Sequence, residues 1–268
     1  MRARVLTGLV GIPLLIVIIW FGFPWLMLLV LAVSLAALLE IHRLMERAGA
    51  HPSLAAGALM AIATVLAFQF HEHLGGYLLP IAVGALSLSL LWNTFARGRG
   101  GFSDWACTVG GVLYVSFLLS HVLLLSEVGE GSEGRNWVMF TLFTTFAADT
   151  GAFFTGLAMG RHAMAPGISP NKTWEGAAGG LAWAVGIAVA LGAVLHLPVL
   201  LWQQALLGLA VGIFGQLGDL VESRIKRAVQ VKEAGFLVPG HGGVLDRLDS
   251  VAFTMPMVYY LVVLAFGR

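Results

Sequence analysis

The chain has 268 residues, of which 59% are hydrophobic and only 11% are charged, and its mean hydropathy is +0.89. Ordinary soluble domains contain about 45 to 50% apolar residues, so this composition excludes a soluble globular domain and indicates a polytopic membrane protein. The formal net charge is +1, and we expect no nucleic-acid partner. Cys107 is the single cysteine, which excludes an intrachain disulfide and a zinc cluster of thiolates.

Apolar runs of about 17 to 22 residues are long enough to cross a bilayer as helices. The first two runs are separated only by Gly22 and Pro24, and the N-terminal run lacks a small-residue cleavage site, so we interpret it as a retained helix. We predict an all-α polytopic integral membrane helical bundle with about nine transmembrane helices. The predicted spans are 5–21, 24–41, 53–70, 77–95, 105–126, 137–158, 174–195, 199–220 and 249–266.

The distribution of basic residues predicts which way the bundle faces, because Lys and Arg collect in cytoplasmic loops. With the N-terminus inside and nine spans, every Lys and Arg except Arg135 and Arg268 falls on the cytoplasmic side. The polar loops 160–173 and 221–247 then face the cytoplasm. We therefore expect a protein of the prokaryotic inner (plasma) membrane, with its N-terminus, its active site and a polar cavity facing the cytoplasm.

Acidic residues within predicted spans are the next signal, because a buried unpaired carboxylate costs several kcal/mol. Asp149 could line a site or cap a broken helix, and Asp219 could be a ligand or an interfacial end residue. Asp246 and Asp249 are spaced i, i+3, so both project from one face of a helix that starts near Leu245. One of them alone could be an N-cap. Both together, near Asp219, suit a divalent cation, since magnesium takes oxygen ligands and shares them with substrate phosphates.

The segment 223–249 is unusually polar for this chain, which favours a site over a solvated linker. Its GHGG run at 240–243 could be a phosphate cradle, because glycines let backbone N–H groups approach an anion at a helix start, or a plain turn. His241 could donate to phosphate or be an ordinary loop histidine. The charged residues of the segment are Arg224, Lys226, Arg227, Lys232, Glu233, Asp246, Arg247 and Asp249.

A second polar motif, SPNKTWEG at 169–176, precedes the span 174–195. Ser169, Lys172 and Thr173 could contact a nucleotide there. Two structural alternatives stay open, because Thr173 with Glu175 nearby could simply cap the helix and a lysine at the mouth of a span is often a topology anchor.

These motifs resemble the signature of the phosphatidate cytidylyltransferases, also called CDP-diacylglycerol synthases. The likeness runs through SRIKR at 223–227, the Lys232-Glu233 pair and PGHGGVLDRLDS at 239–250, and it extends to DTGA at 149–152 and to SPNKTWEG. It is specific over about the last 120 residues. One position departs, because Glu233 stands where the family usually has aspartate, and we do not expect Glu233 to be a direct metal ligand.

The resemblance implies transfer of CMP from CTP to phosphatidic acid, giving CDP-diacylglycerol and pyrophosphate. A phosphate monoester is largely dianionic at neutral pH, so the attacking lipid phosphate needs no protein base, and catalysis rests on positioning and charge neutralisation. The implied cofactor is Mg²⁺, with a second cation as an open alternative. The implied partners are CTP, phosphatidic acid, membrane lipids and a second copy of the chain in a homodimer.

The resemblance also distributes roles within the chain. Residues 1–100 would supply N-terminal transmembrane helices, and residues 101–268 would carry the catalytic site with the signature loop 221–249. We expect Asp219, Asp246 and Asp249 to hold the metal and to act catalytically together with Lys226 and Arg227. The predicted substrate-binding residues are Ser169, Lys172, Thr173, Ser223, Lys232, His241, Gly242, Gly243, Arg247 and Asp149.

Two other functional classes stay open. A CTP-dependent lipid kinase or an archaeal-lipid cytidylyltransferase would share the bundle and the CTP site. A cation-coupled transporter would also explain Asp149 and Asp219 within spans. Against the transporter, the polar residues concentrate on one side of the membrane and the chain shows no internal repeat.

Overall fold

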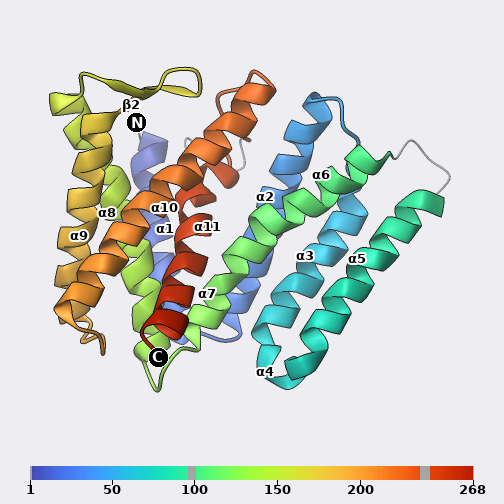
Figure 1. Ribbon diagram of the computed structural model, residues 1–268, viewed down its shortest axis with the longest axis horizontal. Coiled ribbons are helices and arrows are strands. Elements are labelled where there is room, and N and C mark those ends of the chain that lie inside the picture. Colours follow the sequence, from blue (N-terminus) through green and yellow to red (C-terminus); the bar gives the residue numbers. More distant parts are fainter. Residues whose placement is uncertain (1, 96–100, 236–241, 268) are drawn as a thin grey trace.

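The computed structural model describes residues 2–95, 101–235 and 242–267, and most of them are helical (Figure 1). The first half of the chain forms α1 (Arg2–Phe21), α2 (Trp25–Arg47), α3 (Leu54–Gln69), the short α4 (His71–Leu74) with a 3-10 turn (Gly75–Tyr77), and α5 (Leu78–Phe95). It continues with α6 (Phe102–Val112) and α7 (Leu118–Ser126), joined by a π-helical turn (Leu113–Phe117).

The second half is built from four long helices. They are α8 (Glu133–Met159), α9 (Trp174–Val194), α10 (Leu201–Ala228) and α11 (Leu245–Tyr260), which a π-helical turn (Leu261–Ala265) prolongs. Between α8 and α9 the chain forms an antiparallel hairpin of β1 (Ala163–Ala165) and β2 (Ser169–Thr173), in which Ala163 pairs with Thr173. We expected only a polar loop at 160–173, and the short strands there are an addition to the predicted helices.

Six helical segments within the described residues are long and apolar enough to cross a membrane. Three shorter apolar helices coincide with the predicted spans 5–21, 53–70 and 77–95. The prediction of an all-α polytopic membrane protein is confirmed, whereas nine spans and a cytoplasm-facing cavity stay predictions. The six segments are Trp25–Arg47, Phe102–Ser126, Glu133–Met159, Trp174–Val194, Leu201–Ala228 and Leu245–Ala265.

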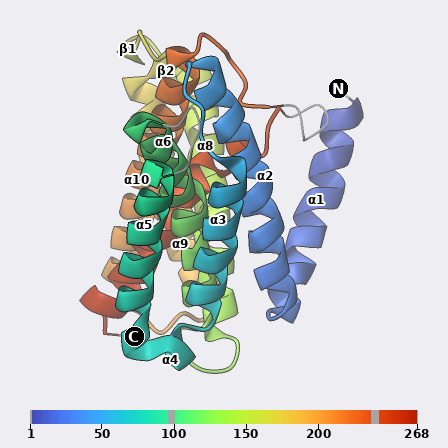
Figure 2. The same cartoon turned by 90° about the vertical axis from the view of Figure 1, so that its right-hand side faces the viewer.

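The helices form two groups. In the C-terminal group, α8, α9, α10 and α11 pack extensively on one another, while α2, α3, α6 and α7 form a second group beside them (Figure 1). Helix α1 lies at the margin, against α2 and α8 (Figure 2). The hairpin, the end of α10 and the N-terminus lie at one end of the bundle, and the C-terminus lies at the other (Figures 1 and 2). Sequence-distant polar segments therefore meet at one end.

Small residues allow the C-terminal helices to approach one another closely. A Cβ on Gly176 of α9 would lie 2.9 Å from the backbone oxygen of Ala152 on α8, and a Cβ on Gly180 would lie 2.9 Å from the Ala152 side chain. Close backbone approach through small residues is a usual basis of helix association in membranes, where apolar burial between helices gives little driving force. The glycines thus hold α9 against α8 at the level of the polar cavity described below.

Gly218 provides a test of this close packing. A Cβ on Gly218 of α10 would collide with the backbone oxygen of Asp249 on α11 and would lie 2.9 Å from the ring of Phe253. We expect Gly218→Ala to push α11 away and to reduce the free energy of unfolding by about 1–3 kcal/mol, measured as a lower melting temperature in detergent. Gly186→Ala on α9 is the control, since its Cβ would meet nothing within 4 Å. Equal melting temperatures of the two variants would contradict the proposed fit.

Candidate active site

A cavity of about 660 Å³ lies between α8, α9, α10, α11 and strand β2. Its apolar side includes Phe153 and Leu157 of α8, and both side chains are exposed on the outside of the bundle. Its other side is strongly polar. The charged and hydroxyl-bearing residues that line it are Asp149, Lys172, Thr173, Asp219, Asp246, Arg247, Asp249 and Ser250.

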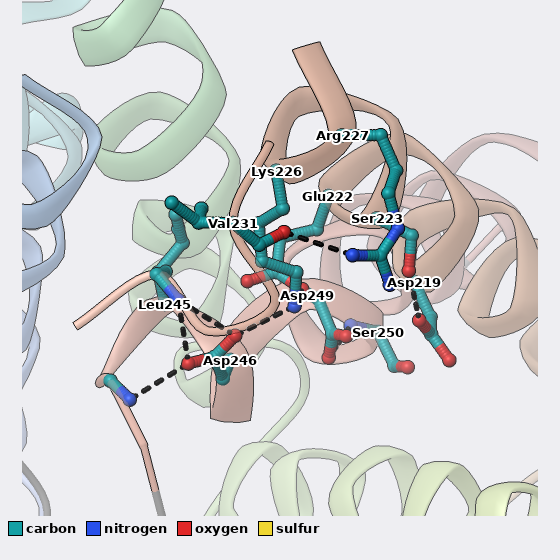
Figure 3. A network of polar contacts seen from close by, with 12 residues as sticks. Asp219, Glu222, Ser223, Lys226, Arg227, Val231, Leu245, Asp246, Asp249 and Ser250 are labelled. Carbon is teal, nitrogen blue, oxygen red and sulfur yellow. Dashed lines mark hydrogen bonds and ion pairs between the residues drawn. The ribbon is translucent and has the colours of Figure 1, made fainter. Parts of the chain in front are cut away.

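Three carboxylates meet where α10 and α11 cross. Asp219 and Glu222 are one turn apart on α10, Asp249 comes from the first turns of α11, and one oxygen of each lies within 4.8 Å of the others (Figure 3). Glu222 is fully buried, and its Oε1 has no hydrogen-bond partner among the described residues. Carboxylate oxygens gathered in this way are the donor set that a hard divalent cation prefers. The cluster could therefore hold such an ion.

Lys226 lies on the same face of α10 as Glu222 and bridges Glu222 to Asp246 of α11. Its Nζ donates to Glu222 Oε2 at 2.6 Å and to Asp246 Oδ1 at 2.7 Å (Figure 3), and the side chain is only 11% exposed. Asp246 also accepts from the backbone N–H groups of Gly243 at 2.8 Å and Ala234 at 3.0 Å. Asp246 thus joins α10, the loop after α10 and the start of α11, in addition to lining the cavity.

The hairpin contributes a second positively charged side chain, Lys172. Lys172 of β2 places its Nζ 2.6 Å from Asp219 Oδ2, and the Ser223 hydroxyl donates to Asp219 Oδ1 at 3.2 Å. Thr173 accepts from the backbone N–H of Gly176 at 3.1 Å and is the N-cap of α9, as the structural alternative expected. Its neighbour Lys172 is therefore held at the edge of the cavity by the start of that helix.

Asp149 of α8 also lines this cavity. Helix α8 continues through this residue, which excludes the alternative that Asp149 caps a broken helix. Its carboxylate accepts a long contact of 3.5 Å from the Ser250 hydroxyl and lines the same cavity as Asp219 and Asp249. The predicted set Asp149, Asp219, Asp246 and Asp249 is thus gathered around one space.

Other predicted site residues lie outside the lining of this cavity. Arg227 donates to the backbone oxygen of Val231 at 3.0 Å (Figure 3). It also donates to the backbone oxygen of Ile168 at 3.1 Å, so it ties the hairpin to α10 and to the loop after it. Lys232 and Glu233 are exposed, and Ser169 is half-buried in β2. The site roles proposed for Arg227, Lys232 and Ser169 stay predictions, and no such role was proposed for Glu233.

The glycines before α11 are only partly described. Gly242 has a φ of +81°, a conformation that glycine adopts without strain. The backbone N–H of Gly243 donates to Asp246, so in this structure that group binds a carboxylate of the chain itself. His241 lies outside the described residues.

Glu40 is a buried carboxylate that the motif analysis did not single out. It comes from α2, is fully buried, and accepts from the backbone N–H of Leu245 at 2.8 Å. The backbones of Gly235 and Gly243 lie so close that a Cβ on either would collide with its carboxylate. Glu40 therefore fixes the start of α11 from a helix that is distant in sequence. In the sequence, Glu40 could have been singled out because it is an acidic residue within the predicted span 24–41.

Replacing Glu40 should loosen the start of α11. Glu40→Leu leaves the buried N–H of Leu245 without an acceptor, which typically costs about 1–3 kcal/mol of unfolding free energy, and we expect a lower melting temperature together with slower turnover. Glu40→Gln retains an acceptor oxygen, so its melting temperature and its turnover should fall less. Thermal melting and activity of the two purified variants check this. Equal losses in the two would contradict a hydrogen-bonding role.

Glu222 is the second residue that the motif analysis passed over. It lies between Asp219 and Lys226 on one face of α10, and its i, i+3 and i, i+4 spacings to those residues were the signal. An interfacial position at the end of the span 199–220 was considered for Asp219 alone, and Glu222 lies just beyond that span. The structure buries it completely.

Comparison with known proteins identifies relatives along almost the entire chain. The model of the cytidylyltransferase family matches residues 2–265. A phosphatidate cytidylyltransferase of Bacillus subtilis (strain 168) is 32% identical over 267 residues, which cover 98% of each chain. The protein of that name from Staphylococcus haemolyticus (strain JCSC1435) is 31% identical over 264 residues, 98% of this chain and 99% of the relative.

Proposed function

This chain belongs to the cytidylyltransferase family, and we infer from that membership that it transfers CMP from CTP to phosphatidic acid. The products are CDP-diacylglycerol and pyrophosphate, and the enzyme is a nucleotidyltransferase of phospholipid biosynthesis. The similarity over nearly the full length to proteins named phosphatidate cytidylyltransferase carries this conclusion. The polar cavity supports it, because cationic and acidic side chains suited to a nucleotide and its metal line one space beside apolar helices.

The acidic cluster fits the magnesium ion that such a reaction implies. Asp219, Glu222 and Asp249 offer only oxygen donors within 4.8 Å of one another, and the buried Glu222 Oε1 lacks a partner among the described residues. Bound Mg²⁺ would supply charge neutralisation and Lewis-acid polarisation at the CTP phosphates. Asp246 stays a predicted ligand, and its Oδ1 already accepts from Lys226. Enzymes that act on phosphate esters often use two metal ions, and we propose a second cation at this site.

The chain's own residues would position the substrates and balance their charge. Lys172 and Arg247 line the cavity beside the acidic cluster and would offset negative charge on the triphosphate and on the leaving pyrophosphate. The lipid phosphate attacks as a dianion, whose second pKa is near 6 for phosphate monoesters, so no side chain needs to remove a proton. Lys226 acts by holding Glu222 and Asp246 in place.

We propose that this end of the bundle faces the cytoplasm of a bacterial cell. The hairpin, the end of α10 and the N-terminus lie together there (Figure 1), and the basic residues of these segments follow the positive-inside rule. CTP would enter from the cytoplasm and the lipid from the membrane. A homodimer is also proposed, on the family resemblance alone.

The position of a radioactive label tests the reaction directly. CTP labelled at the α-phosphate should transfer its label to phosphatidic acid, and CTP labelled at the γ-phosphate should release it as pyrophosphate. A lipid that acquires the γ label would instead identify a CTP-dependent lipid kinase. Transfer to an archaeal ether lipid in preference to phosphatidic acid would identify the sister cytidylyltransferase, and no labelled lipid with any acceptor would restore the transporter as the leading alternative.

A further inference from the structure

A second cavity, of about 210 Å³, lies between α1, α2, α7, α8 and α11. Among the described residues that line it, Arg247 is the only one with a polar side chain. On α2 the lining residues recur at i, i+3, i+4 and i+7, so a single face of that helix forms one wall. Representative lining residues are Leu15, Ile19, Leu29, Val33, Val138 and Leu142.

Arg247 belongs to the walls of both cavities. On α11, Asp249 and Ser250 face the polar cavity, whereas Leu248 and Val251 face the apolar one. Helix α11 thus separates the two spaces, and Arg247 in its first turn reaches both. A guanidinium suits this place, because its stem packs on apolar surface while its charged end binds phosphate oxygens.

The two cavities also follow each other along α8. The apolar cavity is lined from Val138 to Phe146, eight positions apart and about 12 Å along the axis at 1.5 Å per residue. The polar cavity takes over at Asp149 and continues to Leu157. A molecule with a phosphate at one end and a hydrocarbon chain at the other would meet matching surfaces in the same order.

We propose that the apolar cavity holds one acyl chain of the lipid substrate, with the lipid phosphate beside Arg247 at the entrance to the polar cavity. This proposal rests on the proposed function and adds where the lipid lies. The alternative route for the chain is along Phe153 and Leu157, which line the polar cavity and are exposed on the outer surface. The second cavity differs in reaching from Arg247 into the interior of the bundle.

Filling the cavity should discriminate against long acyl chains. Leu29 and Val33 of α2 are only partly buried, so Leu29→Trp and Val33→Phe can extend into the space. We expect each to raise the KM for dioleoyl phosphatidate about tenfold relative to dioctanoyl phosphatidate, because the burial of about two methylene groups is lost, with the KM for CTP unchanged. Leu28→Trp is the matched control, since Leu28 is 47% exposed and does not line the cavity.

An unchanged ratio of the two KM values in both cavity variants would overturn the proposal. An equal change of that ratio in Leu28→Trp would overturn it as well. The wild-type enzyme must form CDP-lipid from both substrates in the same assay. If it forms neither product, the proposed function itself fails, and that outcome differs from an active enzyme without chain discrimination.

Photocrosslinking gives a second measurement that needs no turnover. A phosphatidate that carries a diazirine near the end of one acyl chain should label peptides of α2 and α8 around Leu26 and Val138, the lining residues of those helices farthest from Arg247, and excess unlabelled dioleoyl phosphatidate should suppress the labelling. Labelling confined to the outer surface at Phe153 and Leu157 would overturn the proposal. Labelling that phosphatidate and phosphatidylcholine suppress equally would assign the cavity to bulk membrane lipid and would overturn it too.

Discussion

Asp249→Asn is expected to lower kcat/KM for CTP by about 100-fold or more. Asp249 shares the acidic cluster with Asp219 and Glu222, and a metal ion held there contributes several kcal/mol of charge stabilisation in the transition state, where each 1.36 kcal/mol is a factor of about ten. The concentration of magnesium that gives half-maximal activity should rise at the same time. Pyrophosphate release measured over a magnesium series reports both effects.

Glu46→Gln is the matched control for this experiment. Glu46 is an exposed carboxylate near the end of α2 and lies outside both cavities, so its removal should leave kcat/KM and the magnesium dependence unchanged. Full activity of Asp249→Asn with an unshifted magnesium dependence would show that the cluster does not hold the catalytic ion.

Lys226→Met should cause the largest loss of stability. Lys226 pairs with Glu222 and Asp246 at 2.6 Å and 2.7 Å, and its removal leaves two carboxylates without their shared cation. Breaking a buried ion pair by removing one partner typically costs about 3–5 kcal/mol of unfolding free energy. We expect a much lower melting temperature in detergent and no measurable turnover.

A double variant separates the loss of stability from the loss of turnover. Lys226→Met combined with Glu222→Gln removes one of the stranded charges, so the melting temperature should recover in part while turnover stays lost. Lys226→Arg keeps the cation and should retain more stability than Lys226→Met. A Lys226→Met protein as stable as the wild type would mean that the observed ion pairs contribute nothing to the fold.

Local sequence patterns were sufficient to place most of the acidic site. The i, i+3 spacing of Asp246 and Asp249, together with the carboxylates at Asp149 and Asp219, predicted side chains around one space, and all four line the same cavity. Hydropathy could not predict the end of α10, which continues past the apolar span to Ala228. Lys and Arg are good helix formers, so the helix persists where the apolar pattern stops.

The residues that local patterns did not reveal depend on contacts between distant segments. Arg227 turns to the backbone of the hairpin, and Lys226 reaches Asp246 on α11, and no spacing within α10 indicates either contact. Glu40 binds the backbone of Leu245 across 205 positions of sequence. Such a contact requires the packing of α2 against the start of α11, which no local motif encodes.

The release of pyrophosphate by detergent-purified protein shows directly whether this chain transfers CMP from CTP to phosphatidic acid. CTP, magnesium and phosphatidic acid are supplied together and then omitted one at a time. We expect release only when all three are present, with a CDP-lipid formed in equal amount. Release that persists without the lipid, or a complete mixture that yields neither pyrophosphate nor CDP-lipid, would show that the chain does not catalyse this transfer.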